Sequence, residues 1–516
     1  MNRIRDRSAV DGKILSPEEH AQVLIVGAGP AGLSAALESA ALGAKVLLID
    51  ENPIDPDLFG LDIPLYFGGR MTGSVRDRNR ILERWFAAEP KFVRALELGV
   101  DIRLGVIAWG LYANGPHMQA LPVPMVGLAD EDRSWMCGFD KLILATGARD
   151  IALAFPGWDQ PGVLGANGFR SLVERYSAFS GRRIVVFGSG PLAVSTALLA
   201  RRNGIDVAAI VEVLDEAQSP AGSLHELIGL DIPVLTRHTP LRAGQGADGV
   251  DRLLLRDRTG KEVELSCDTI CLAIGTAPAI DLLNSAGGRT VADARRGGHV
   301  PFLDGWATSI DHVFATGDCA GLAANEDEAI EWGRQASRQT LDKDWRGTPS
   351  GGADAWRYQV AWYEALTRQA EPPLIVCQCE AVTRADLLEV SAPRYLGRPT
   401  TRAMARNLST LINDGPVSQD QIKRLTRAGM GVCQGRRCRE QVALTLSQAA
   451  HITPAEVPLA GFRPPVRPLP LRVIADWAEK PAMAAHWELW FGIRGQWAAY
   501  EDIGTEREFE SFFGGG

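Results

Sequence analysis

Short apolar runs alternate along the chain with glycine turns and with longer stretches of small and apolar residues. Near the start, the run VLIV is followed by the turn GAGPAG, by small and apolar residues as far as Leu42, and by a second run, VLLID, which ends at Asp50. A short apolar run bounded by glycine is typical of a strand inside a parallel sheet, and small residues let a helix lie close against it. The pattern predicts strand, tight turn, helix and strand over residues 21–50.

The same pattern returns in the middle of the chain. Residues 183–213, RIVVFGSGPLAVSTALLARRNGIDVAAIVEV, again indicate strand, glycine turn, helix and strand. Two strand-like segments enclose this repeat, DKLILATGARD over residues 140–150 and DHVFATGDCAG over residues 311–321. We therefore expect an α/β chain with two nested Rossmann-like dinucleotide-binding domains, followed by a small, mainly helical domain and a C-terminal extension.

The first glycine turn has the spacing of a pyrophosphate-binding site. Gly27 permits the tight turn, Gly29 lets backbone amides approach the phosphates, and Gly32 allows close helix packing, while the helix N-terminus supplies positive potential. An acid at the end of the next strand can accept hydrogen bonds from a ribose. The predicted binding residues are Gly27, Gly29, Pro30, Ala31, Gly32, Asp50 and Glu51.

The second turn offers Gly188, Gly190 and Ala193, with Glu212 at the end of the following strand. An acidic strand end favours NAD over NADP, because a carboxylate repels the additional phosphate. Three states of this site stay open from the sequence: it holds NAD(H), it holds another adenine nucleotide, or it is idle.

Two segments identify the nucleotide of the first site. Ala145, Thr146 and Gly147 end one strand, and Gly317 and Asp318 end the other. These segments resemble the flavin-domain signatures of the glutathione-reductase-like family, and the resemblance implies FAD in the first site. The stretch LFGLDIPLYFGGRMTG contains no cysteine, which excludes thiol–disulfide exchange beside the flavin.

Bulk properties narrow the class of protein. A chain of 516 residues is too long to fold around a single hydrophobic core. Its net charge of −9, without a basic stripe, argues against nucleic acid as a partner. No apolar stretch is long enough for a transmembrane segment, and the start lacks a signal peptide. We therefore expect a cytoplasmic protein, which would associate with a membrane only peripherally, by binding its electron acceptor there. The histidines form no recognisable base constellation, so no catalytic residue is predicted.

Four of the eight cysteines lie close together near the carboxyl end. Cys377 and Cys379 form a CxC pair, and Cys433 and Cys438 form a CxxxxC pair on the loop after a predicted helix. Four thiolates can hold zinc or an iron–sulfur cluster. The loops are wider than the usual CxxC zinc knuckle, which favours the cluster, but the residues alone leave both open.

The segments CQCEAVTRADLLEV and IKRLTRAGMGVCQGRRC resemble the bacterioferritin-associated-ferredoxin-like 2Fe-2S domain. That domain is appended to the A subunits of opine oxidases and to related subunits of hydrogen cyanide synthase, hydroxyproline dehydrogenase and the sarcosine oxidase alpha chain. Over residues 20–470 the resemblance implies that Cys377, Cys379, Cys433 and Cys438 ligate a 2Fe-2S cluster. It further implies FMN at a subunit interface near the arginine-rich cysteine loop.

The resemblance also implies partners and a function. We expect an electron-transfer subunit of a hetero-oligomeric dye-linked amino-acid, opine or amine dehydrogenase. Its partners would be an FAD-dependent, amino-acid-oxidase-like catalytic subunit, a small third subunit and a downstream electron acceptor. Two alternatives remain: a self-sufficient NAD(P)H-dependent flavin and iron–sulfur reductase, and a zinc-bearing scaffold or regulatory subunit.

The expected domain boundaries follow from these motifs. They are 20–152 with 290–345 for the FAD-binding domain, 153–289 for the second dinucleotide-binding domain, 346–371 for a linker, 372–452 for the 2Fe-2S domain, and 453–516 for a linker with a Trp-rich extension.

Overall fold

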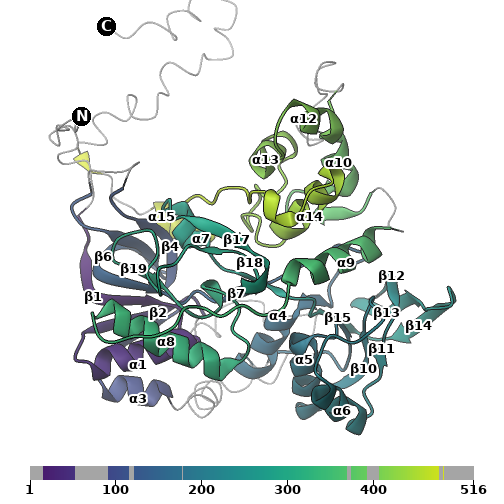
Figure 1. Ribbon diagram of the computed structural model, residues 1–516, viewed down its shortest axis with the longest axis horizontal. Helices are drawn as coiled ribbons and strands as arrows, with labels where there is room; N and C mark the ends of the chain where they lie inside the picture. The colour runs from purple at the N-terminus through teal and green to yellow at the C-terminus, as the bar shows by residue number, and fades with distance from the viewer. Residues whose placement is uncertain are drawn as a thin grey trace, which may run out of the picture.

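The computed structural model describes residues 16–52, 91–115, 121–176, 178–368, 373–391, 406–475 and 480–481. Trp477, Trp487, Trp490 and Trp497 of the predicted Trp-rich extension lie outside these residues, as does the cysteine-free stretch after the first nucleotide motif. Figure 1 shows two α/β domains side by side, with a helical lobe above them. The predicted fold class is confirmed.

The first domain is built on a seven-stranded sheet with the strand order β3-β2-β1-β6-β5-β4, to which β19 is added beside β6. Its strands are β1 (Glu19–Val26), β2 (Val46–Asp50), β3 (Asp101–Leu104), β4 (Ile107–Tyr112), β5 (Met125–Ala129), β6 (Ser134–Leu144) and β19 (Val313–Ala315). Strands β1, β2, β3, β6 and β19 run parallel, whereas β4 and β5 join antiparallel. The parallel half carries the first glycine turn at its carboxyl edge.

Alternating residues of the first sheet enter two separate cores. Val23 and Ile25 of β1 pack with Leu33 and Trp332, which belong to the helices on one face, whereas Leu24 and Val26 pack into the opposite core. The helices on this face are α1 (Pro30–Ala41), α3 (Lys91–Glu97) and α8 (Glu326–Thr340). The sheet is buried on both faces, which explains why its strands lack a polar–apolar alternation.

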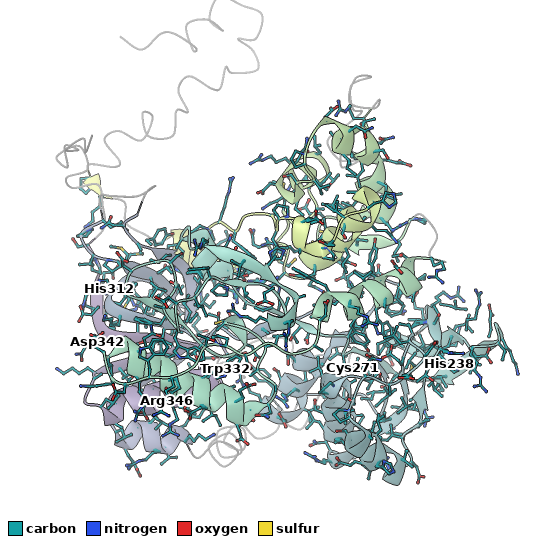
Figure 2. All side chains as sticks on the ribbon, viewed as in Figure 1. His238, Cys271, His312, Trp332, Asp342 and Arg346 are labelled. Atoms are coloured by element: carbon teal, nitrogen blue, oxygen red, sulfur yellow. The ribbon has the colours of Figure 1, made fainter. Side chains whose placement is uncertain are left out.

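The second domain has a five-stranded parallel sheet with the order β11-β10-β9-β15-β8. Its strands are β8 (Val163–Gly165), β9 (Arg183–Phe187), β10 (Asp206–Val211), β11 (Val234–Leu235) and β15 (Thr269–Leu272). The helices α4 (Ala166–Arg170), α5 (Pro191–Arg202) and α6 (Ala221–Gly229) accompany it, with a three-stranded antiparallel sheet of β12 (Thr239–Gly246), β13 (Gly249–Arg256) and β14 (Glu262–Ser266). Figure 2 shows Cys271 inside this domain, where its side chain is fully buried.

The two domains are joined by paired strands. The chain leaves the first domain through β7 (Ala148–Asp150) and returns through β16 (Thr276–Pro278), and these two strands pair antiparallel. Helix α7 (Asp281–Ser285) and the hairpin of β17 (Thr290–Asp293) and β18 (Gly298–Pro301) follow the return. The second domain is therefore an insertion in the first, as the nested sequence motifs predict.

The four clustered cysteines belong to the helical lobe. Its elements are β20 (Ile375–Cys377), β21 (Val382–Thr383), α10 (Arg384–Glu389), α12 (Leu408–Asp414), α13 (Gln419–Thr426) and α14 (Arg439–Ala450). The helices α10, α12, α13 and α14 are labelled in Figure 1. Thr383 and Asp386 form a capping box at the start of α10, and Ser418 caps α13. Helix α13 ends at the left-handed residue Arg427, and Gly429, two residues later, also has a positive φ.

The segment predicted to be a linker contains helix α9 (Ala355–Thr367). This helix lies between the second domain and the cysteine lobe (Figure 1), and its Trp362 is fully buried in a core that both of them share. α9 is therefore a packing element as well as a connection. No helix among the described residues is long and apolar enough to cross a membrane.

Candidate cofactor sites

The first glycine turn is shaped by two tight contacts and one open space. A Cβ on Gly27, whose φ is +106°, would lie 2.2 Å from the Ala145 carbonyl oxygen, and a Cβ on Gly32 would lie 1.9 Å from the Gly27 carbonyl oxygen. Among the described residues, no atom apart from the local backbone lies within 4 Å of a Cβ built on Gly29. The open side at Gly29, beside the N-terminus of α1, fits the pyrophosphate of a dinucleotide.

Asp50 ends β2 directly beside this turn. Its carboxylate accepts hydrogen bonds from the Ala28 amide at 2.8 Å and from the Asn52 amide at 2.8 Å. The Arg175 guanidinium lies 4.0 Å from it. The structure thus brings the predicted ribose-binding acid to the glycine turn, where these donors fix the orientation of the carboxylate. The neighbouring Glu51 points elsewhere, because it pairs with Arg467 at 2.7 Å.

Both predicted flavin signatures meet the first turn. The Ala145 amide donates to the Val26 carbonyl at 2.9 Å, and Thr146 Oγ1 donates to the Ala279 carbonyl at 2.7 Å. A Cβ on Gly317 would lie 2.7 Å from the Cβ of Ala31, so this end of the second signature is tight against α1. The first glycine turn and the two flavin signatures, which are far apart in the sequence, therefore lie around one site.

Asp318 is the carboxylate that the second signature contributes. Burial raises its pKa, and the Ala323 amide donates to it at 3.2 Å. A single amide leaves capacity for further donors, such as the hydroxyls of a ribityl chain. Cys319 beside it is buried and its thiol donates to the Leu144 and Thr316 carbonyls, which fits a packing role.

The second turn repeats the backbone of the first but differs at its acid. Gly188 has a φ of +97°, and nothing lies within 4 Å of a Cβ built on Gly190. Ala193 is fully buried under the turn in α5. The Glu212 side chain is also fully buried, and it accepts hydrogen bonds from Ser189 Oγ at 2.5 Å and from the Tyr358 hydroxyl at 2.5 Å.

The four clustered cysteines come together although two loops supply them. The Sγ atoms of Cys377 and Cys379 are 4.0 Å apart, and those of Cys379 and Cys433 are 3.6 Å apart. The Cys438 thiol hydrogen-bonds to the Cys377 sulfur. Cys377 and Cys438 are buried, Cys433 is partly exposed and Cys379 is exposed. The four sulfurs thus lead from the interior of the lobe to its surface.

Hydrogen bonds make these thiols unequal. The hydrogen bond from Cys438 lowers the pKa of Cys377 to about 6, and the Gly429 amide, 3.5 Å from its sulfur, acts in the same direction. The bond to Cys377, together with burial, holds the pKa of Cys438 well above its usual value, and burial raises that of Cys379 to about 12. A cluster bound by four thiolates would have to displace these protons.

Glycine keeps the surroundings of the sulfurs open. A Cβ on Gly431 would lie 2.5 Å from the Cys379 sulfur, and Gly429 and Gly435 have positive φ values. Among the described residues, no set of three or more His, Cys, Asp or Glu side chains is arranged to hold a single metal ion. The donor set is a string of four thiols flanked by small residues. Both zinc and an iron–sulfur cluster accept a donor set of four thiolates.

A buried ionic network joins the cysteine lobe to the first domain. Arg149, two residues after the flavin-signature Gly147, hydrogen-bonds to Glu440, two residues after Cys438. Arg149 also lies 3.7 Å from the Asp281 carboxylate, to which Arg467 donates at 2.7 Å. All four side chains are at most 18% exposed. Helix α14, which begins directly after Cys438, is thus fixed against the flavin-signature segment.

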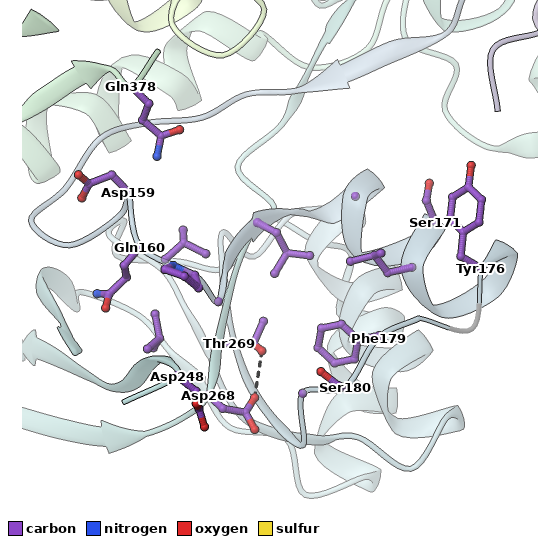
Figure 3. A pocket seen from close by; sticks show the side chains of 18 of the residues that line it. Asp159, Gln160, Ser171, Tyr176, Phe179, Ser180, Asp248, Asp268, Thr269 and Gln378 are labelled. Carbon is purple, nitrogen blue, oxygen red and sulfur yellow. Dashed lines mark hydrogen bonds between the residues drawn. The ribbon is translucent and has the colours of Figure 1, made fainter. Parts of the chain in front are cut away.

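A pocket of about 730 Å³ lies beside the cysteine loops (Figure 3). Gln378, between the two cysteines of the CxC pair, and Arg437, next to Cys438, form one end. Tyr176 and Phe179 line its other side, and the edge strand β8 contributes Val163. The motif FPGWDQPGVLGANG supplies much of this wall, so that motif shapes a cavity next to the cysteines.

The sequence motifs did not identify three residues of these sites: Arg149, Glu440 and Tyr358. Arg149 stands directly after the ATGA of the first flavin signature, a position that could have drawn attention to it, but nothing in the sequence pairs it with Glu440. Tyr358 lies in the segment predicted to be a linker, and only the aromatic spacing of RYQVAWY hints at a packed helix.

Two glycine-turn domains, nested through paired strands and with both flavin signatures at the first turn, define an FAD-dependent oxidoreductase of the two-dinucleotide-fold class. The chain belongs to the pyridine nucleotide-disulphide oxidoreductase family, whose sequence profile matches residues 21–340. A second profile, the sarcosine oxidase A3 domain, matches residues 402–477, which include Cys433 and Cys438.

Curated relatives are named as parts of larger enzymes. The chain is 27% identical to the opine oxidase A-type polypeptide of Agrobacterium tumefaciens, covering 88% of this chain and 91% of that protein. It is 26% identical to the HcnB component of hydrogen cyanide synthase from Pseudomonas protegens, covering 83% and 92%. It is 24% identical to the sarcosine oxidase alpha chain of Rhizobium meliloti, covering 95% of this chain and 47% of that one. The expected resemblance is confirmed.

Among solved structures, L-proline dehydrogenase from P. horikoshii is similar with a TM-score of 0.59 and 21% identity, covering 88% of this chain and 79% of that one. At this identity the likeness shows the fold alone. It extends over most of the chain, so the arrangement of two dinucleotide domains with further C-terminal structure recurs there.

Proposed function

We propose that this chain is the FAD- and 2Fe-2S-bearing electron-transfer subunit of a hetero-oligomeric dehydrogenase that oxidises a C–N bond. The partner would be an FAD-dependent, amino-acid-oxidase-like subunit that binds the amino acid, opine or amine. The names of the similar proteins, each one component of a larger enzyme, support an assembly of this kind. The small third subunit, the interfacial FMN and the downstream acceptor are parts of the same proposal.

The observation that carries the proposal is the position of the four thiols. They lie together on one lobe, and α14, which begins directly after Cys438, is held against the flavin-signature segment by the Arg149–Glu440 pair. FAD supplies two-electron chemistry and a 2Fe-2S cluster supplies one-electron transfer, so the pair converts between the two. No residue set for substrate acid–base chemistry is needed for such a task.

The chain's own residues have distinct duties in this proposal. Gly29 and the N-terminus of α1 bind the pyrophosphate, Asp50 binds the ribose, and Asp318 accepts from the polyol. Cys377 and Cys438 hold the cluster from the buried side, and Cys433 and Cys379 from the exposed side. The exposed side opens near the pocket at Gln378 and Arg437, where an electron acceptor or a partner protein can reach the cysteine loops.

The test is iron and acid-labile sulfide analysis of the full chain purified without oxygen, combined with visible spectroscopy. We expect a 2Fe-2S cluster and FAD together. Cys433→Ala should lose iron, sulfide and cluster absorbance while it retains FAD, because the thiols and the first glycine turn belong to separate lobes. The matched control is Cys267→Ala, a buried cysteine of the second domain, which should keep both cofactors.

Zinc in place of iron would contradict the proposal and favour the scaffold alternative. Loss of FAD in Cys433→Ala but not in Cys267→Ala would refute the assignment of the two cofactors to separate lobes. Substrate-dependent reduction of the cluster only when the catalytic partner is added would support the relay itself.

A further inference from the structure

The second dinucleotide-binding domain is obstructed by the chain's own helix α9. The Tyr358 hydroxyl lies at the second glycine turn, where it accepts a hydrogen bond from the Ser189 amide at 3.0 Å and donates one to the Glu212 carboxylate at 2.5 Å. We propose that Tyr358 is a specificity-determining residue that excludes nicotinamide dinucleotides from this domain. Electrons would then not enter the chain from NAD(P)H.

The two glycine turns show what Tyr358 changes. In the first turn, the amide after the first glycine, that of Ala28, donates directly to the strand-end acid Asp50 at 2.8 Å. In the second turn, the equivalent amide of Ser189 reaches the acid Glu212 only through the Tyr358 hydroxyl. The Tyr358 hydroxyl therefore takes a hydrogen-bonding position on the Glu212 carboxylate that a ribose hydroxyl would need in order to bind this acid.

The carboxylate of Glu212, the acid of the second turn, has no oxygen that faces solvent. Glu212 is fully buried, and its carboxylate also accepts from Ser189 Oγ at 2.5 Å and from the Leu214 amide at 3.0 Å. Asp50 of the first turn also accepts from three protein donors, but its side chain is 11% exposed, whereas Glu212 is not exposed at all. Burial, and next the negative charge of Glu212, raise the pKa of Tyr358, so its hydroxyl stays a donor at neutral pH.

Helix α9 cannot release Tyr358 without a loss of packing. One turn further along this helix, Trp362 is fully buried and stacks on Phe187, the residue before Gly188, with ring centroids 5.5 Å apart and planes at 23°. Tyr363 hydrogen-bonds to Thr445 of α14 at 2.8 Å. The hydroxyl of Tyr358 lies 3.2 Å from a Cβ built on Gly188, so the fit at the turn itself is close.

A fold of this family implies a pyridine nucleotide in the second domain, and the described residues do not fit one. The glycine spacing is retained as a packing motif, because Ala193 and Gly188 still let the helix, the strand and Tyr358 approach one another. The inference does not depend on the proposed electron relay, since a closed site is compatible with any electron source other than NAD(P)H.

The experiment uses the full chain with FAD bound and three probes: NADH, NADPH and ADP-ribose. Isothermal titration calorimetry and anaerobic titration of the flavin absorbance should show no saturable binding and no bleaching up to about millimolar concentration, which corresponds to a binding free energy weaker than about −4 kcal/mol. Hydrogen exchange at the amides of residues 187–192 should be unchanged by ADP-ribose.

Two variants test the role of Tyr358 itself. Tyr358→Ala should bind ADP-ribose at least about tenfold more tightly than the natural chain. The control, Tyr363→Phe, removes a hydroxyl of the same helix that does not contact the turn, and it should not gain binding. If Tyr358→Ala does not fold, the exchange experiment on the natural chain decides alone.

Micromolar binding of any probe, or added protection at residues 187–192, would overturn the inference. Equal ADP-ribose binding by Tyr358→Ala and the natural chain would overturn the assignment to Tyr358. Bleaching of the flavin by NADH would refute both this inference and the relay in favour of the reductase, whereas binding without bleaching would refute this inference alone.

Discussion

The buried pair of Arg149 and Glu440 allows a sharp test of how the cysteine lobe is held to the first domain. Glu440→Leu removes one carboxylate and leaves the Arg149 guanidinium, which is 14% exposed, without its hydrogen-bonded partner. Breaking a buried pair from one side costs about 3–5 kcal/mol, because an uncompensated charge remains. Asp281, 3.7 Å from Arg149, still offers partial compensation, so we expect about 3 kcal/mol.

The reverse change should behave similarly, but the two together should not add. Arg149→Met leaves the buried Glu440 without its ion-pair partner, whereas Asp281 keeps Arg467 at 2.7 Å. In the double variant no uncompensated charge remains, and apolar side chains of similar volume replace the pair. We therefore expect the double variant to lose less stability than either single variant. Because each single loss is about 3 kcal/mol, the coupling energy would be about 3 kcal/mol or more.

The assay is urea denaturation with saturating FAD, followed by tryptophan fluorescence, on the natural chain, both single variants and the double variant. The control is the exposed pair of Glu331 and Arg334 on α8, whose side chains are 51% and 52% exposed. Removing Glu331 should change the free energy of unfolding by about 0.5 kcal/mol or less. Strictly additive losses at Arg149 and Glu440 would refute the claim that this pair joins the lobes.

Three further predictions address the first nucleotide site, the ionic network and the acid at the first turn. Gly29→Ala places a methyl group where no described atom apart from the local backbone lies within 4 Å, so the thermal midpoint should be retained while FAD affinity falls about tenfold or more; Gly222→Ala in α6 is the matched control, and normal FAD affinity in Gly29→Ala would remove the pyrophosphate assignment. Burial alone would raise the pKa of Asp281, but Arg149 and Arg467 lower it below its ordinary value. The ionised Asp281 therefore stabilises the folded chain above the unfolded-state pKa of about 3.9, and this contribution is lost as the pH falls through the folded-state pKa. Asp281→Asn should therefore cost stability in urea at neutral pH and progressively less in acid, and an equal cost at both would contradict this. Asp50→Ala should weaken FAD binding by about 1.5–3 kcal/mol in equilibrium dialysis, through loss of a charge-assisted hydrogen bond, and unchanged retention would contradict the ribose assignment.

Local motifs were sufficient for much of the fold and for the positions of the predicted sites. The glycine turns at Gly27 and Gly188 could be predicted because a short stretch of backbone sets their φ values and their tight contacts. The helix caps at Thr383 and Ser418 are also local, because each is a contact between residues three positions apart. The pairing of cysteines was also predictable, since each pair shares one loop. The assignments of bound FAD and of the cluster ligands stay predictions until the cofactors are analysed.

Other features depend on contacts between segments far apart in the chain. The sequence of the second turn, with Gly188, Gly190 and Glu212, resembles a working nucleotide site, and only the tertiary structure shows that Tyr358 from α9 fills it. Similarly, nothing local indicates that the predicted linker is a buried helix. Such contacts arise when apolar surfaces of remote elements pack, and no short sequence pattern records which surfaces meet.

The sequence by itself therefore determined the kinds of chemistry that the chain can carry: two glycine turns of the dinucleotide-binding type and four thiols able to bind metal. Backbone conformation and donor atoms at these places are set by neighbouring residues, so sequence spacing is enough to predict them. Only the tertiary structure decided which of those capacities is accessible and how the lobes are held, because burial of Glu212 and the pairing of Arg149 with Glu440 are products of long-range packing.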